Sequence, residues 1–174
     1  DFVFNNAGIG SHKKPVGEIE DADWQRMINI NLSGVFYCIK HQVPAMLQSG
    51  GGVIINNSSI LGVRALPDTS VEYTAAKHGV IGLIRGLSEE YMRTPITFNA
   101  VCPGYVDTDI VRNQIPGLMR RFDTDEAGAV AIIAKGNRHR RLLEVDETTS
   151  AAMWLCSDGA RSIDGQKIQI SGGQ

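Results

Sequence analysis

Residues 51–59 read GGVIINNSS and place a short apolar run between glycines and polar residues. The centre of the run, Val53 to Ile55 with its neighbours, is β-branched and too short for a typical helix, so we predict a buried strand. Ser58 and Ser59 follow at the carboxyl end of that strand. In parallel open sheets ligands bind beyond these strand ends, which places both hydroxyls near a potential site.

Strands and helices alternate on both sides of this stretch. The alternation implies βαβ units, a parallel sheet and a single α/β domain over residues 1–174. The predicted elements are the strand FVF (2–4), a helix from about Trp24 to Leu47 capped by Asp21, the strand in 51–59, a helix from about Ser70 to Met92, the strand ITFNAVCPG (96–104), a polar segment with some helix (109–143), a helix from Glu144 to Ser157 and the strand QKIQI (166–170).

Composition excludes several classes of function. The formal net charge is −2, and the one basic run, 138–141, is typical of a solvated loop, so no nucleic-acid surface is predicted. No apolar run reaches the roughly 18 residues that a membrane span needs. The cysteines are far apart and the histidines follow no metal-ligand spacing, so we expect a cytoplasmic protein with no metal. These residues are Cys38, Cys102, Cys156, His12, His41, His78 and His139.

The stretch EYTAAKHG (72–79) holds the first candidate for chemistry, Tyr73 and Lys77. Four residues apart on a helix, they share one face. A cation beside a phenol favours the phenolate, so the pKa of Tyr73 should fall from about 10 towards neutrality. Such a tyrosine can exchange a proton with an alcohol or carbonyl oxygen. The spacing alone is weak support, because it can arise by chance.

Small residues crowd the same helix. A glycine costs a helix about 1 kcal/mol, so their presence indicates that something packs closely. A neighbouring strand, a cofactor or a partner subunit would each explain them. They are Ala75, Ala76, Gly79, Gly82 and Gly86.

Two further positions carry a functional and a structural interpretation. A hydroxyl at Ser58 or Ser59 could donate to a substrate oxygen, or it could cap the turn. Asn31 falls in the middle of an apolar stripe of the first helix. Since a buried amide needs partners, it is either a core asparagine bonded to backbone or an amide that faces a wet active site.

Six motifs, in this order, resemble the classical short-chain dehydrogenases/reductases along the whole chain. They are NNAG (5–8), NLSG (31–34), NNSS (56–59), YTAAK (73–77), NAVCPGYVDT (99–108) and IDGQKIQISGG (163–173). The loop between Ser59 and Tyr73 is about one residue longer than is common in the family, which weakens the choice of Ser59 over Ser58.

The resemblance implies reversible hydride transfer between NAD(P)(H) and a small-molecule alcohol or ketone. It implies Tyr73 as general acid/base, Ser59 as donor to the substrate oxygen, Lys77 as the residue that tunes Tyr73 and binds the nicotinamide ribose, and Asn31 as holder of a relay water. The implied cofactor contacts are Asn6, Ala7 and Gly8 beside the adenine-side ribose, and Pro103, Gly104, Val106 and Thr108 near the nicotinamide.

The resemblance also implies a fold of which this sequence holds a part. Family members begin with a βαβαβ half that carries a glycine-rich pyrophosphate-binding turn; SGGG (49–52) and SGG (171–173) stand elsewhere. We therefore expect an incomplete Rossmann-like doubly wound sheet, strands 4 to 7, with an exposed apolar edge. The residue that separates NAD from NADP is not readable, and we expect these residues alone to bind dinucleotide poorly and be inactive.

Substrate and assembly follow less directly. VRNQI (111–115) resembles the helix where 3-hydroxybutyrate dehydrogenases place a carboxylate-binding glutamine, here Gln114, but Gly10 and Gly62 stand where that subgroup needs side chains. A 3-oxoacyl thioester, a sugar or a cyclic alcohol fits equally. The family suggests a homo-oligomer, tetramer or dimer, packed through the helices 31–47 and 70–92. The alternative function is a truncated, non-catalytic chain that acts only as a subunit-binding partner.

Overall fold

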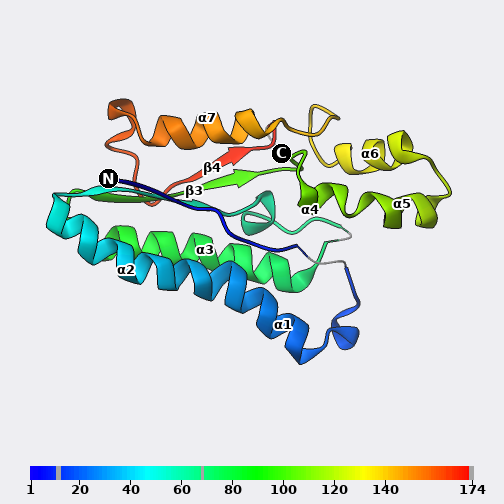
Figure 1. Ribbon diagram of the computed structural model, residues 1–174, viewed down its shortest axis with the longest axis horizontal. Helices are drawn as coiled ribbons and strands as arrows, with labels where there is room; N and C mark the ends of the chain where they lie inside the picture. Colours follow the sequence, from blue (N-terminus) through cyan, green and yellow to red (C-terminus); the bar gives the residue numbers. More distant parts are fainter. Residues whose placement is uncertain (11–12, 68, 173–174) are drawn as a thin grey trace.

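The computed structural model describes residues 1–10, 13–67 and 69–172 (Figure 1). Four parallel strands form one sheet in the order β1-β2-β3-β4. Their bounds are β1 Phe2–Asn5, β2 Gly52–Asn57, β3 Ile96–Pro103 and β4 Lys167–Ile170. All four predicted strands are confirmed within a residue or two at each end. His12 and Gly173, which the sequence interpretation mentions, lie outside the described residues.

Helices cover both faces of the sheet. Figure 1 shows α2 (Gly34–Ser49) and α3 (Val71–Glu90) on one face and α7 (Val145–Leu155) on the other. The strand β2 serves both layers, because successive residues of a strand point to opposite faces. Ile54 packs in the cluster under α2 and α3, whereas Ile55 packs in the cluster under α7. The buried apolar run at 53–55 therefore holds a three-layer α/β/α fold together.

The strands all end on the side where the short helices gather. In Figure 1 the arrows of β3 and β4 point towards α4 (Asp109–Arg112), α5 (Ile115–Phe122) and α6 (Glu126–Ala134). Residues 109–143, predicted as loop with some helix, thus carry three helices. A separate apolar cluster that includes Val111, Ile115 and Ala129 holds them to each other.

The first predicted helix differs from its prediction. It begins at Asp21, with Glu20 rather than Asp21 as N-cap residue. It is also not continuous: α1 (Asp21–Ile28) passes into the π-helical turn η2 (Asn29–Ser33) before α2 begins. Since π-helical turns widen a helix by one residue and are frequent at functional sites, the interruption marks the turn that carries Asn31.

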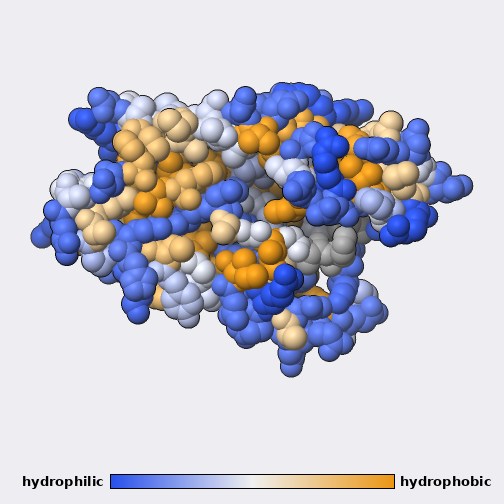
Figure 2. Space-filling model, viewed as in Figure 1, coloured by the Kyte–Doolittle hydropathy of each residue, from blue (hydrophilic) through white to orange (hydrophobic). Residues whose placement is uncertain are grey.

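One edge of the sheet is apolar and exposed, as expected. The strand β1 pairs with β2 alone, and the Phe2 and Phe4 side chains are 65% and 43% exposed. Figure 2 shows hydrophobic residues gathered between α7 and β1. Within the described ranges 1–10, 13–67 and 69–172, none of the helices has the length and apolar character required to cross a membrane.

Candidate functional site

The helix α3 places Tyr73 and Lys77 one turn apart, as predicted. Its N-terminus is fixed by Ser70, whose hydroxyl accepts a hydrogen bond from the Tyr73 amide at 3.2 Å. The Lys77 ammonium lies 5.5 Å from the centre of the Tyr73 ring and donates to the Asn57 carbonyl oxygen at 2.7 Å. The end of β2 therefore holds the lysine beside the tyrosine.

The two serines after β2 have different surroundings. The Ser58 hydroxyl is buried and donates to the Lys77 carbonyl oxygen at 3.0 Å. The Ser59 oxygen accepts from the Leu61 amide at 3.1 Å, and a hydrogen bond joins Ser59 to Tyr73. The hydroxyl of Ser58 thus has a structural role, since it joins β2 to α3, and Ser59 is the hydroxyl that lies beside Tyr73.

Burial governs the protonation of the pair. It raises the pKa of Tyr73 above its ordinary value, although the hydrogen bond with Ser59 opposes that rise. It also lowers the pKa of Lys77 to about 8. We expected Lys77 to lower the pKa of Tyr73, but in this structure the pKa is raised. Desolvation of the phenol outweighs the attraction of a cation 5.5 Å from the ring.

Two cavities meet at Tyr73 and Ser59. The larger, of about 520 Å³, is lined by Asn6, Ala7, Gly8, Asn57, Pro103, Gly104, Val106, Thr108 and Thr148 among others. The smaller, of about 310 Å³, is lined by Ile60, Leu61, Ile110, Gln114 and Arg121 among others. Tyr73, Ser59 and Gly104 line both. All seven residues predicted as cofactor contacts besides Tyr73 and Lys77 thus surround one cavity.

Asn31 lies beside this centre without lining either cavity. Its side chain is fully buried; the amide nitrogen donates to the Ile9 carbonyl oxygen at 3.0 Å, and Oδ1 accepts from the Ile9 amide at 3.1 Å. A Cβ added to Gly8 would stand 2.7 Å from Asn31 Oδ1 and 3.7 Å from Lys77 Nζ. The side chain therefore fixes the loop after β1 against the lysine, as the backbone-bonded interpretation predicts.

Sequence reasoning missed two groups of the larger cavity. Asn57 donates to Asn6 Oδ1 at 2.8 Å, but its own Oδ1 is buried and has no hydrogen-bond partner among the described residues. The Thr148 hydroxyl of α7 is also buried and has no hydrogen-bond partner among the described residues. The NNSS motif gave a signal for Asn57, whereas Thr148 reaches the cavity only because α7 packs on the sheet.

The predicted substrate residue Gln114 lies in the smaller cavity, but its amide nitrogen is engaged. Nε2 donates to the Ile110 carbonyl oxygen at 2.8 Å. An amide nitrogen carries two hydrogens, so Gln114 in this orientation has one N–H left to donate to a substrate carboxylate. At Gly62, an added Cβ would stand 2.4 Å from Ser58 Oγ and 2.6 Å from the Lys77 carbonyl oxygen. Close packing thus explains this glycine.

The described part of the chain offers no metal centre: no group of three or more His, Cys, Asp or Glu side chains within it could hold an ion. The arrangement is instead a parallel α/β sheet with a phenol, a hydroxyl and an ammonium at the carboxyl ends of its strands. Such a site suits proton exchange with an oxygen atom next to a large neighbouring ligand.

Comparisons with known proteins agree with this class. A family model described as enoyl-(acyl carrier protein) reductase matches residues 1–174. The chain is 37% identical to D-beta-hydroxybutyrate dehydrogenase of Rhizobium meliloti over 177 residues, covering 99% of this chain and 67% of the relative. It is 35% identical to cyclohexanol dehydrogenase of an Acinetobacter species, covering 98% and 62%. It is 37% identical to cis-4-hydroxycyclohexanecarboxylate dehydrogenase of Sinomonas cyclohexanicum, covering 99% and 65%.

Solved structures give the same result. A variant of actinorhodin polyketide ketoreductase with NADPH superposes with a TM-score of 0.91 at 31% identity, covering 99% of this chain and 66% of that one. The chain belongs to the short-chain dehydrogenase/reductase family. It spans about two thirds of the length of the relatives that it matches.

Proposed function

We propose that the protein transfers a hydride between NAD(P)(H) and an alcohol or ketone, with Tyr73 as general acid/base. The observation that carries the proposal is the meeting of two cavities at Tyr73 and Ser59. One cavity is large enough for the reactive end of a dinucleotide, and the other opens onto the same phenol and hydroxyl.

The residues of the larger cavity fit a nicotinamide dinucleotide. Small residues, Ala7 and Gly8, form one wall, where a side chain at Gly8 would collide with Asn31. The unpartnered oxygens of Asn57 and Thr148 are acceptors that the hydroxyl and carboxamide donors of a nucleotide can satisfy. Two solved relatives, ElxO and actinorhodin polyketide ketoreductase, have NADP or NADPH bound. Bound there, the cofactor would supply or accept the hydride.

The protein's own residues handle the proton. The Tyr73 phenol gives its proton to the carbonyl oxygen in reduction and takes it back from the hydroxyl in oxidation. Because the Leu61 amide occupies an acceptor site on the Ser59 oxygen, the Ser59 hydrogen can donate to the same substrate oxygen. Lys77, held by Asn57, keeps a positive charge beside the phenol and stabilises the phenolate that oxidation requires.

The smaller cavity guides the choice of substrates. Its wall combines aliphatic side chains with two charged ones among the described residues, Lys13 and Arg121. Both are cations, so a panel should pair each hydroxy acid with an uncharged counterpart. 4-Hydroxycyclohexanecarboxylate and cyclohexanol, 3-hydroxybutyrate and 2-butanol form two such pairs.

The test is turnover of this panel with NAD and NADP, followed through the absorbance of the reduced nicotinamide. Tyr73→Phe should lower kcat by about 10²- to 10⁴-fold, the usual contribution of a general acid/base. Tyr91→Phe, at the end of α3 and outside both cavities, is the matched control and should keep wild-type turnover.

A Tyr73→Phe variant that turns over as fast as the wild type would exclude the proposed role. If the full-length protein shows neither turnover with any pair nor binding of NAD or NADP by calorimetry, the non-catalytic alternative replaces the proposal.

A further inference from the structure

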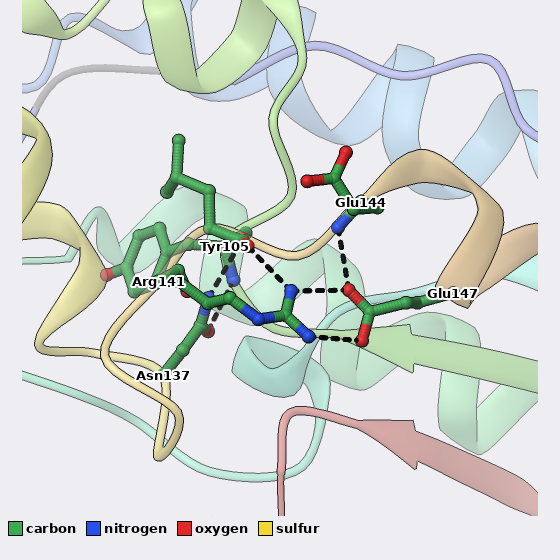
Figure 3. A network of polar contacts seen from close by, with 6 residues as sticks. Tyr105, Asn137, Arg141, Glu144 and Glu147 are labelled. Atoms are coloured by element: carbon green, nitrogen blue, oxygen red, sulfur yellow. Dashed lines mark hydrogen bonds and ion pairs between the residues drawn. The ribbon is translucent and has the colours of Figure 1, made fainter.

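A single buried side chain holds the loop where the two cavities meet. Asn137 is 1% exposed and follows α6 in the chain. Its Oδ1 accepts from the Tyr105 amide at 2.9 Å, and its Nδ2 donates to the Tyr105 carbonyl oxygen at 2.8 Å (Figure 3). The same Nδ2 donates to the Arg141 carbonyl oxygen at 2.8 Å. Asn137 therefore forms hydrogen bonds with both the amide and the carbonyl group of Tyr105, in the loop after β3.

The position of the Asn137 side chain also explains why residue 104, at the centre of the site, is a glycine. A Cβ added to Gly104 would stand 2.3 Å from Asn137 Oδ1. Gly104 lines both cavities, so the contact that excludes a side chain at Gly104 lies directly behind the wall facing Tyr73 and its ligands. Asn137 itself lines neither cavity.

The residue before Asn137 positions a ring. A Cβ added to Gly136 would stand 2.3 Å from Cε2 of Tyr105, so the Tyr105 ring lies directly against this glycine. Tyr105 lines the smaller cavity. The Gly136–Asn137 pair thus fixes the backbone of Tyr105 through two hydrogen bonds and its ring through packing.

The other end of the segment is tied to the opposite wall. The Arg141 guanidinium donates to both carboxylate oxygens of Glu147 on α7 at 2.7 and 2.9 Å (Figure 3). This hydrogen bonding is the main reason why the pKa of Glu147 falls to about 2. Since Thr148 and Thr149 of α7 line the larger cavity, one connected network spans from the Gly104 loop to the far wall.

From these contacts we infer that Asn137 is a positioning residue for the proposed reaction: through Tyr105 it sets the place of Gly104 between the two ligand cavities. The inference rests on the proposed function for its readout. It assigns to the segment 136–141, whose basic residues suggested a solvated loop, a role in the geometry of the site.

Asn137→Asp is the sharpest test, because the shape is kept while both donated hydrogen bonds are lost. Displacement of a site loop by about 1 Å can cost about 100-fold, so we expect kcat/KM to fall by about 10- to 100-fold at temperatures where the variant is folded. A buried carboxyl group that takes up a proton can donate again. The loss of kcat/KM relative to wild type should therefore shrink as pH is lowered. Circular dichroism at each pH should show an unchanged folded fraction, whereas a purely structural defect would change kcat/KM and the folded fraction together. Asn113→Asp, exposed and outside both cavities, is the control.

A second variant covers the case in which Asn137→Asp does not fold. Gly136→Ala leaves both hydrogen bonds but pushes the Tyr105 ring, so the KM for the alcohol should rise while the KM for the nicotinamide cofactor changes less. The inference is overturned if a folded Asn137→Asp variant keeps wild-type kcat and KM, or if Gly136→Ala leaves the KM for the alcohol unchanged. Normal cofactor turnover by the Tyr91→Phe control separates these outcomes from a failure of the proposed function.

Discussion

The hydroxyl of Ser58 is bonded to the backbone of Lys77, 19 residues further along the chain, at 3.0 Å. This contact ties the end of β2 to the middle of α3. It turns the next residue, Ser59, towards Tyr73, and the packing around it excludes a side chain at Gly62. The two neighbouring serines therefore differ in role by geometry, not by chemistry.

Removal of each hydroxyl should separate these roles. Ser58→Ala leaves the Lys77 carbonyl without this donor, so the free energy of unfolding should fall by about 1 kcal/mol. Ser59→Ala leaves the Leu61 amide without its acceptor, so it should also cost about 0.5–1 kcal/mol. It alone of the two variants should lower kcat by more than tenfold. Urea unfolding and turnover, measured on both variants, check the assignment. A larger loss of kcat in Ser58→Ala than in Ser59→Ala would reverse it.

The raised pKa of Tyr73 predicts different pH profiles for the two directions of the reaction. Burial keeps the phenol protonated at neutral pH, so it is ready to donate in reduction. Oxidation needs the phenolate, so its rate should rise as pH increases from about 7 to 10. The reduction rate should stay nearly level over that range, because the raised pKa keeps the phenol of Tyr73 largely protonated. Steady-state rates with saturating substrates check this, and an oxidation rate that stays level would contradict it.

Lys77 should make the free energy of unfolding depend on pH. Its folded-state pKa is about 8, whereas the ordinary pKa of a lysine is 10.5. Between these values the unfolded chain binds a proton that the folded chain does not, so stability rises with pH in this window. The gain is on the order of 3 kcal/mol.

Urea unfolding of the wild type and of Lys77→Met across this window isolates the effect. Burial raises the pKa of Cys102 to about 11, which acts in the opposite direction. Lys77 and Cys102 also interact electrostatically, so the comparison is made in a Cys102→Ala background, which removes this contribution from both proteins. A difference that does not change with pH would mean that Lys77 titrates normally.

Much of the fold was predictable because its signals are local. Apolar runs bounded by Gly, Asn or Pro marked three strands, and an alternating pattern marked the strand at 166–170. The Tyr73–Lys77 spacing marked a helical face. The π-helical turn at 29–33 was not predictable from hydrophobic periodicity, since a single inserted residue barely disturbs an apolar stripe. Asp21 looks like an N-cap residue, but the helix starts one residue earlier, within the usual uncertainty of helix ends.

The site residues that lie in sequence motifs next to strand ends could be predicted. Those that reach the site only through tertiary packing could not. Asn6, Gly8, Gly104 and Ser59 follow strands, so topology alone brings them together. Asn137, in the turn after α6, and Thr148, on α7, lie far along the chain and reach the site through packing. The protonation of Tyr73 was predicted with the wrong sign for these residues, because sequence spacing reports a nearby cation and not the extent of burial.

Two glycines of α3 bear on the expected oligomer. A Cβ at Gly79 would collide with Leu32 of the same chain, so intramolecular packing explains this glycine. At Gly82 and Gly86 an added Cβ would meet nothing within 4 Å, and both are exposed. Four residues apart, they share one helix face, which suits close approach of a second copy.

Gly86→Arg should therefore lower the molar mass measured by size exclusion with light scattering. The arginine side chain would occupy the space that a second copy needs to pack against this helix face. Arg85→Lys, which keeps the charge beside Gly86, is the control and should keep the assembly. A wild-type protein that elutes as a monomer would refute the expected homo-oligomer.

The backbone at Arg140 predicts a stabilising substitution. Arg140 has φ of 53°, a left-handed conformation that costs a non-glycine residue about 1–2 kcal/mol. Its amide closes a turn onto the Asn137 carbonyl oxygen at 2.9 Å, so the turn cannot simply relax to negative φ. Arg140→Gly removes the steric cost while adding entropy to the unfolded chain, which leaves a net gain of about 0.5–1 kcal/mol.

Asp123, with φ of 47° after α5, is the matched comparison. Aspartate tolerates this conformation better than arginine does, so Asp123→Gly should gain less. Urea unfolding of both variants measures the two gains. A loss of stability in Arg140→Gly would show that the Arg140 side chain contributes more to the segment 136–141 than its strained backbone costs, and the segment would then owe its shape to more than the Asn137 contacts.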